Sequence, residues 1–310
     1  MKSNFVRQNI FPTLAAFIWG TAFVAQSVAS EHVQPFTFNA SRSIIAFVFL
    51  LALAFGLHIY RRGKGEDITR GAAYWRDLLI GGLFCGLALF LATNLQQKGI
   101  ETTTSGKAGF ITALYIVIVP ICGLFLRKKV SGMIWFSVAL AVAGLYFLCI
   151  NESMTISSGD FYILLCAFCF AGHILVIDHF THKVDGVELS CAQFLVGSLL
   201  SGAAMLIFET PEWATVSLAL GEILYVGIFS SGVAYTLQIL AQKGSNPTTV
   251  SLLMSLEAVF ATLGGAIILN DQMTGREYFG CALMMLAVIL AQIPDFSFKM
   301  FKAKLPKQSY

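Results

Sequence analysis

Apolar stretches long enough to cross a membrane recur along the whole chain of 310 residues. We count ten runs of roughly 18 or more mainly apolar residues, the length that a helix needs to span a bilayer. They cover about 10–30, 37–60, 78–97, 104–126, 132–150, 159–179, 188–208, 217–241, 247–269 and 276–293. The short segments between them leave no room for a soluble catalytic domain. The sequence therefore predicts an all-α integral membrane protein with ten transmembrane helices.

The placement of basic residues predicts how these helices are oriented. Only 12% of the residues are charged, whereas soluble domains carry about 25%. With the N-terminus in the cytoplasm, sixteen of the twenty Lys and Arg residues fall on the inner side. Lys98, Lys107 and Arg276 fall outside, and Arg42 lies within a span. This bias predicts that both termini are cytoplasmic.

The N-terminal stretch, the basic loops and the C-terminal tail give no indication of a cleaved signal peptide or of nucleic-acid binding. The first apolar stretch runs directly into the second without a small-residue cleavage pattern, so we expect no cleaved signal peptide. The basic loops are expected to contact membrane lipids. The tail 296–310 alternates Phe and Lys in FSFKMFKAK and is predicted to lie along the inner membrane surface.

The two halves of the chain resemble each other. Three pairs of segments align: LQQKGIETTT (95–104) with LAQKGSNPTT (240–249), AAFIWG (15–20) with CAFCFA (166–171), and PFTFNASR (35–42) with GVELSCAQ (186–193). The offset is 151 residues for the last two pairs and 145 for the first, so the first half has extra residues in its basic loop around 61–76.

This repeat divides the chain into a first five-helix unit (1–150), a second (151–295) and a basic cytoplasmic tail (296–310). Because five is odd, the second unit must sit upside down relative to the first. Inverted repeats of this kind are typical of secondary transporters, whose substrate site lies near mid-membrane between the halves.

Five segments also carry familiar motifs: FIWGTAFVAQ (17–26), PFTFNASR (35–42), KAGFITALYIVIVP (107–120), AVAGLYFL (141–148) and SLEAVFATLGGAIILNDQMTGREYFG (255–280). Together they resemble the ten-helix EamA-type branch of the drug/metabolite transporter superfamily, from about residue 10 to 293. The resemblance implies a transporter of amino acids or related metabolites in a bacterial inner membrane, more often an exporter than an importer.

The sequence departs from the family pattern at two places in this resemblance. Ala258 stands where members commonly have Pro after the Glu of the ninth helix, and it is expected to straighten that helix. Asn270 and Asp271 stand where members commonly have Glu, which keeps the charge with a shorter reach.

Glu257 is the most informative candidate site residue. It lies about ten residues, or roughly 15 Å, from the inner end of its stretch, and a carboxyl buried there is costly. One interpretation is a neutral, hydrogen-bonded group that caps the backbone at a helix contact. The other is a carboxyl that lines a cavity and exchanges a proton during transport. The sequence leaves both open.

The first two stretches contribute four more candidates. Arg42, just below the outer face, either anchors its helix or binds an anionic group, and Asn39 one turn earlier shares either role. Trp19 lies in mid-span and either lines a cavity or packs the bundle. Gln26, on the same face as Trp19, can offer hydrogen bonds near the outer mouth.

Five candidates come from later stretches. Tyr235 and Gln238 belong to a polar stripe that should face the bundle interior. His173 either hydrogen-bonds between helices or lines the cavity. Lys107 either reaches the headgroups or faces the cavity. The resemblance places the segment KAGFITALY (107–115) beside the central cavity, and this makes Tyr115 a candidate as well.

These features predict a secondary-active exporter of small polar metabolites such as amino acids, which works by alternating access. Its partners would be a small-molecule substrate, membrane lipids and protons as a candidate coupling ion, with the protein a monomer or a dimer. A passive facilitator, a membrane sensor and an integral-membrane acyl or headgroup transferase are the alternatives.

The transferase alternative is the enzyme class to exclude. His173 and Asp178 match H-x4-D, but five residues turn an α-helix by roughly 140°, so their side chains point apart. On that geometry we expect no enzyme activity, and we expect no cofactor. We also expect no metal site, because Cys166 and Cys169 form a lone C-x-x-C without a second pair. The sequence contains no phosphate-binding G-x-x-x-x-G-K-[ST] loop, so direct drive by ATP is not expected.

Overall fold

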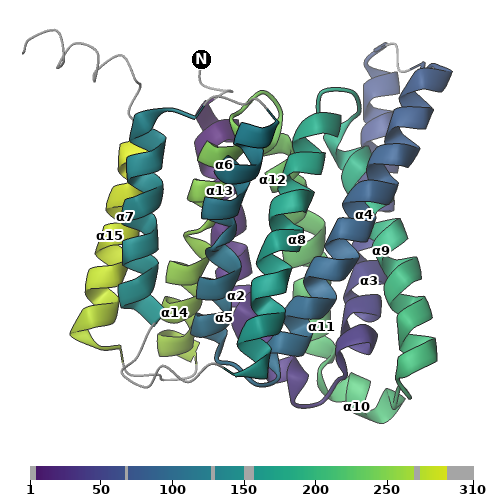
Figure 1. The fold of residues 1–310 in the computed structure, drawn as a ribbon. Helices are drawn as coiled ribbons and strands as arrows, with labels where there is room; N and C mark the ends of the chain where they lie inside the picture. The colour runs from purple at the N-terminus through teal and green to yellow at the C-terminus, as the bar shows by residue number, and fades with distance from the viewer. Residues whose placement is uncertain (1–4, 67–68, 127–129, 150–156, 269–272, 292–310) are drawn as a thin grey trace, which may run out of the picture.

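A computed structural model describes residues 5–66, 69–126, 130–149, 157–268 and 273–291, and the secondary structure in these ranges is entirely helical (Figure 1). Eight segments are long and apolar enough to cross a membrane: Val6–Ser30, Pro35–Gly63, Ala72–Ile100, Ser105–Phe125, Ser158–Phe180, Gly186–Phe208, Leu220–Gln242 and Pro247–Ile268. A shorter apolar helix covers Gly132–Phe147. The prediction of an all-α membrane protein is confirmed for the described residues.

Several of the segments are single continuous helices. These are α3 (Pro35–Gly63), α4 (Ala72–Ile100), α7 (Gly132–Cys149), α8 (Ser158–Phe180), α9 (Gly186–Phe208) and α15 (Gly275–Ala291). In α2 (Phe11–Ser30) a short π-helical turn, η1 (Val6–Ile10), precedes the α-helix. The predicted stretches 132–150 and 276–293 fall on α7 and α15.

Three other segments are not single α-helices, and the first two of them are interrupted. One consists of α5 (Ser105–Ala113) and α6 (Tyr115–Phe125), and another of α13 (Pro247–Met254) and α14 (Glu257–Ile268). The third runs from α11 (Leu220–Tyr225) through the π-helix η2 (Val226–Ala234) to α12 (Tyr235–Gln242), after the short α10 (Trp213–Leu218). Irregular backbone at membrane depth is tolerated where it is buried in protein or lines a cavity.

The expectation that Ala258 straightens the ninth helix is wrong. The helix breaks at Ser255 and Leu256, directly before Glu257, although no Pro follows the Glu. Its counterpart breaks at Leu114, where the sequence has neither Gly nor Pro. The packing of the surrounding helices, rather than a local breaker, therefore supports both interruptions.

The extra residues of the first half form helix rather than loop. Helices α3 and α4 both exceed the predicted stretches 37–60 and 78–97, and they project beyond their neighbours at the top right of Figure 1. We call the end of the bundle that carries residues 61–71 the basic end. The end that carries residues 31–34 and 209–212, at the bottom of Figure 1, is the opposite end.

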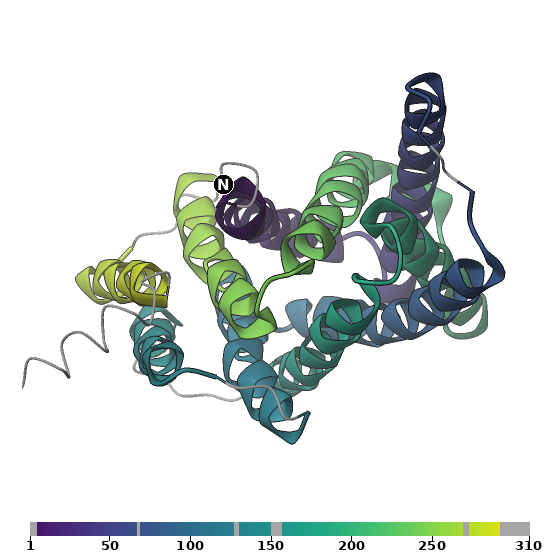
Figure 2. The ribbon, with the colours of Figure 1, turned by 90° about the horizontal axis from the view of Figure 1, so that it is seen from above.

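The helices pack as neighbouring pairs around the middle of the bundle. Helix α3 packs along α9, α4 packs along α8 and α9, and α2 packs against α14 and against the segment of η2 and α12. Helices α7 and α15 pack on each other and form a pair at one side of the bundle (Figure 2).

Glycine permits the close approach of α2 and α14. A Cβ on Gly20 of α2 would overlap the Cβ of Phe260 and lie 2.8 Å from the backbone nitrogen of Ala261 in α14.

Large apolar side chains such as Leu79 and Leu206 point outward, while Gln97, Gln242 and His173 are fully buried. This distribution, apolar outside and polar inside, is expected for a bundle that lipid surrounds.

Candidate functional site

A small cavity lies inside the bundle where the two interrupted helices meet α2, α3, α4, α8 and α12. Its volume is about 30 Å³. The polar residues that line it are Gln26, Arg42, Gln96, Thr112, Ser230, Gln238 and Glu257, and the aromatic and apolar ones are Trp19, Phe23, Tyr115, Phe170, Ile174, Tyr235 and Met254. Because a water needs at least about 10–15 Å³ measured in this way, the cavity has room for about two.

Seven of the ten candidate residues line this cavity: Trp19, Gln26, Arg42, Tyr115, Tyr235, Gln238 and Glu257. They come from five helices that lie far apart in the sequence, and all but Trp19 are buried. That these residues bind a substrate remains a prediction.

The other three candidates do not line the cavity, because residues of neighbouring helices bind them elsewhere. The amide of Asn39 donates to the carbonyl of Thr93 and to Oδ1 of Asn94, both at 3.1 Å. The ammonium of Lys107 lies 2.5 Å from Oδ2 of Asp160. His173 Nε2 is hydrogen-bonded to Oε1 of Gln193 at 2.9 Å.

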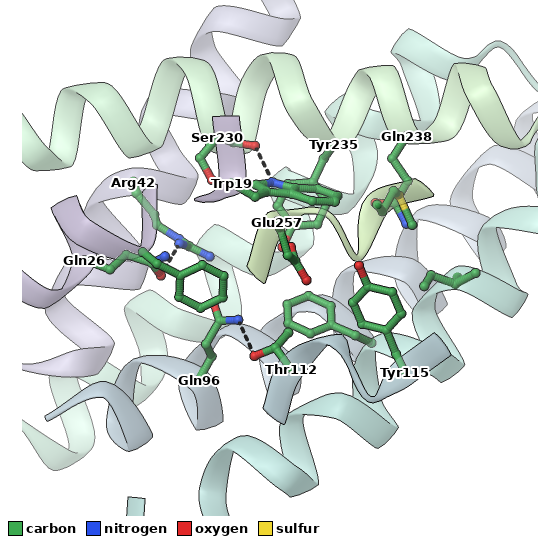
Figure 3. A pocket seen from close by; sticks show the side chains of 14 residues that line it. Trp19, Gln26, Arg42, Gln96, Thr112, Tyr115, Ser230, Tyr235, Gln238 and Glu257 are labelled. Atoms are coloured by element: carbon green, nitrogen blue, oxygen red, sulfur yellow. Dashed lines mark hydrogen bonds between the residues drawn. The ribbon is translucent and has the colours of Figure 1, made fainter. Parts of the chain in front are cut away.

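Arg42 forms one side of the cavity. Its side chain is 2% exposed, and its Nη1 donates to Oε1 of Gln26 at 3.1 Å (Figure 3). Its Nε has no hydrogen-bond partner. Among the described residues, no carboxylate forms an ion pair with it. Burial of a charge without a counter-charge is costly, so Arg42 remains the candidate residue for an anionic group.

Glu257 lies in the middle of the cavity. It is the first residue of α14 and is 3% exposed, and its Oε1 has no hydrogen-bond partner. Tyr115 is the first residue of α6, and its hydroxyl points toward the same space and interacts with the Glu257 carboxyl (Figure 3). Both breaks therefore deliver a polar group to the cavity. This geometry favours the cavity-lining interpretation of Glu257 over the helix-capping one.

An aromatic wall stands beside Glu257. The indole Nε1 of Trp19 donates to the carbonyl of Ser230 in the π-helix at 3.3 Å, which fixes the ring. The ring centroids of Trp19 and Tyr235 are 4.9 Å apart. Tyr235 in turn contacts the rings of His173 and Phe194. His173 thus supports the wall from behind.

The sequence reading missed half of the cavity lining. Phe23, Gln96, Thr112, Phe170, Ile174, Ser230 and Met254 were not candidates, although Gln96 donates to Thr112 Oγ1 at 3.2 Å within the cavity. The repeat carried a signal for two of them. Phe170 aligns with Trp19, and Thr112 aligns with Glu257. Each of these two residues could therefore have been predicted from the candidate that it aligns with in the other half of the chain.

Polar contacts close both ends of the α3–α9 pair. At the basic end, Arg61 pairs with Asp185 at 3.1 Å and Arg70 with Glu188 at 2.9 Å, while Tyr74 hydrogen-bonds to Glu188. The pKa of Asp185 would rise through burial, but the hydrogen bonds from Arg61 and from two main-chain amides lower it below its ordinary value.

At the opposite end, the carboxylate of Glu209 accepts hydrogen bonds from the first turn of α3. The backbone amides of Phe36 and Thr37 donate to it at 2.8 and 2.7 Å, and the Thr37 hydroxyl donates at 2.7 Å. A carboxylate at a helix N-terminus is favoured by the free amides and the helix dipole. In the part of the chain that the structure describes, no group of three His, Cys, Asp or Glu side chains could hold a metal ion.

Comparison with known proteins identifies a matching family and several relatives. The model of the EamA-like transporter family matches residues 8–150 and 157–292. An "uncharacterized transporter" of Archaeoglobus fulgidus is 31% identical over 90% of this chain and 84% of its own. The threonine/homoserine exporter RhtA of Salmonella typhimurium is 29% identical over 65% of this chain and 68% of its own.

One solved crystal structure shows the same fold. It superposes with a TM-score of 0.75 at 16% sequence identity, and the match covers 96% of this chain and 99% of that one.

Proposed function

Since the chain belongs to the EamA-like transporter family, we propose that it is a secondary-active exporter of small polar metabolites, amino acids among them, which works by alternating access. The observation that carries the proposal is the buried cavity, in which Arg42 and Glu257 present polar atoms that have no partner. Secondary transporters bind their substrates in such mid-membrane sites, at interrupted helices.

We propose that ten helices cross the membrane as two inverted five-helix units. The two interrupted helices support this layout, because α5 and α13 are each the short first part of a helix that breaks beside the cavity. The family model also matches two segments, one in each proposed unit. Helices α7 and α15 would be the last helix of each unit and lie together at one side.

The conformation described here would be a closed intermediate of the transport cycle. The cavity is too small for a metabolite, and polar contacts hold both ends of the α3–α9 pair. Release of the contacts of Asp185 and Glu188 would open the basic end, and release of Glu209 would open the opposite end. Substrate entry then requires the interrupted helices to move.

We propose a bacterial inner membrane as the location, with the basic end in the cytoplasm. Arg61, Arg62, Lys64, Arg70 and Arg76 gather at that end, and basic residues favour the cytoplasmic side. Export is supported by the name of a relative, the threonine/homoserine exporter RhtA. Glu257 is the candidate for a coupled proton, and without such coupling the protein would be a passive facilitator.

A ligand screen by thermal shift on the detergent-purified protein tests this function. Amino acids, nucleobases, sugars and organic cations are added separately, because a ligand that binds the folded state raises the melting temperature. We expect a rise with amino acids. Gln238→Ala should abolish the rise, whereas Leu199→Ala, at a position 64% exposed on the outside, should keep it. The absence of a rise with any class, or an equal rise in both variants, would contradict the proposal.

A further inference from the structure

We infer that the cavity recognises a zwitterion with a neutral side chain, with the carboxylate bound at Arg42 and the ammonium bound at Glu257. The inference rests on the proposed transport function and specifies its substrate class. It follows from three walls of the cavity that differ in charge, and each wall constrains a different part of the substrate.

The wall formed by Arg42 requires an anion. The guanidinium is fixed by Nη1 on Gln26, which is itself fixed because its Nε2 donates to the carbonyl of Ala22 at 3.2 Å. Gln26 is neutral and cannot compensate the charge, and Nε of Arg42 is unpartnered. A planar guanidinium with free donors binds a carboxylate through two parallel hydrogen bonds. A carboxylate is therefore the complementary group.

The wall around Glu257 suits a cation. A free carboxyl oxygen faces the cavity beside the stacked rings of Trp19 and Tyr235. Ammonium groups are attracted both by carboxylates and by the faces of aromatic rings. The hydroxyl of Tyr115, beside the same carboxyl, adds an acceptor. A primary ammonium, with three donors, could engage these groups together.

Arg42 and Glu257 do not neutralise each other. Both line the same cavity, yet no ion pair within 4.0 Å joins them. A guanidinium and a carboxyl that stand apart across one cavity are complementary to a molecule that carries both an anionic and a cationic group. A substrate with a single charge would leave the other group buried without a counter-charge, at a cost of several kcal/mol by general estimates.

The third wall limits the substrate side chain. Phe170, Ile174 and Met254 complete the lining and carry no charge. A second charged group on the substrate would meet this wall without a partner, and its desolvation would not be offset. The third wall therefore favours an apolar or uncharged side chain.

Binding of matched analogues to the full-length protein in detergent, measured by calorimetry, tests the inference. The probes are L-leucine, leucinamide (no carboxylate) and 4-methylpentanoate (no ammonium), together with L-threonine, threoninamide and 3-hydroxybutanoate. For the wild-type protein we expect at least one of the two amino acids to bind tenfold or more tightly than both of its analogues. This comparison needs no variant, so it remains decisive if a cavity variant fails to fold.

Two variants then assign the two ends. Arg42→Gln should abolish the preference for the amino acid over its amide but keep the preference over the deaminated acid. Glu257→Gln should abolish the preference for the amino acid over the deaminated acid but keep the preference over the amide. Lys98→Gln and Glu101→Gln remove the same charges from an exposed pair at the opposite end and should leave both preferences unchanged. A uniform loss for all three probes in both cavity variants would overturn the assignment.

The outcomes separate this inference from the transport function. If each of the two amino acids binds to the wild-type protein no more tightly than one of its single-charge analogues, the zwitterion inference is overturned. If the protein transports a purely anionic or purely cationic metabolite in vesicles, the transport function stands and the inference fails. If it transports no small metabolite of any class, both fail.

Discussion

Gln97 and Gln242 make equivalent hydrogen bonds in the two halves of the chain. Gln97 Nε2 donates to the carbonyl of Gln26 at 3.1 Å, and Gln242 Nε2 donates to the carbonyl of Ile174 at 2.8 Å. The two glutamines align in LQQKG and LAQKG and are fully buried. Each ties the third helix of its proposed five-helix unit to the first helix of that unit. The aligned glutamines thus join corresponding helices, although the acceptor Ile174 lies about one turn from Ile177, which aligns with Gln26.

Replacement of these glutamines tests whether the two contacts are equivalent. Gln97→Leu and Gln242→Leu should each lower the free energy of unfolding by about 0.5–1.5 kcal/mol, the usual net worth of one hydrogen bond. Thermal unfolding in detergent gives the comparison, with the exposed Gln34→Leu as the control. A loss at one site and none at the other would contradict the equivalence.

The close contact of α2 with α14 predicts a steep cost for a small change. Gly20→Ala places a Cβ against Phe260 and the backbone of Ala261, and overpacking of this kind costs about 1–3 kcal/mol. Gly56→Ala in α3 meets no atom within 4 Å and should be neutral or stabilising. Melting temperatures of the two variants test the contact, and equal values would show that α2 and α14 do not approach this closely.

The helices could be predicted from the sequence more reliably than the site. Runs of apolar residues indicated their positions. Seven of the fourteen residues that line the cavity were candidates, five within the family motifs and two, Tyr235 and Gln238, from the polar stripe. The breaks at Leu114 and at Ser255 could not be predicted, because no Gly or Pro marks them. They depend on the packing of other helices, which a pattern of single residues does not record.

The three misplaced candidates have a related cause. Asn39, Lys107 and His173 are polar groups within spans, and such groups face the bundle interior whether they bind a ligand or each other. Their partners Asn94, Asp160 and Gln193 lie 20 to 55 positions away. A single sequence shows which residues need a partner, but the pairing appears only when the helices are packed.

Acid should weaken the closure at the basic end. The pKa of Asp185 is lowered in the folded state, so its ion pair with Arg61 stabilises the protein at neutral pH and is lost as the pH falls through that lowered pKa. Since both side chains are partly exposed, the pair contributes about 0.2–1 kcal/mol.

We therefore expect the melting temperature of the wild-type protein to fall more between pH 6 and about pH 3 than that of Asp185→Asn, since an unperturbed Asp titrates near 4. Asp77→Asn removes a carboxylate whose partner Arg76 is well exposed, and it should follow the wild type. Identical pH profiles of the wild type and Asp185→Asn would show that this ion pair does not hold the basic end closed.

The proposed orientation predicts which side each end faces. In a cysteine-free background, Lys64→Cys at the basic end should react with a membrane-impermeant maleimide only after the cells are opened. Glu212→Cys at the opposite end should react in intact cells. Both positions are exposed, so access rather than burial decides the result. Reaction of both cysteines from the same side would contradict the two-unit inverted layout.

Counterflow in proteoliposomes tests most directly whether a small polar metabolite crosses the membrane through the cavity. Vesicles loaded with an unlabelled neutral amino acid should transiently accumulate the labelled one above equilibrium, at a rate well above that of protein-free vesicles. Trp19→Ala should remove the aromatic wall beside Glu257 and lower this rate at least tenfold, while Lys98→Gln should not. Counterflow that is absent with every amino acid, or equal in Trp19→Ala and the wild type, would contradict the account.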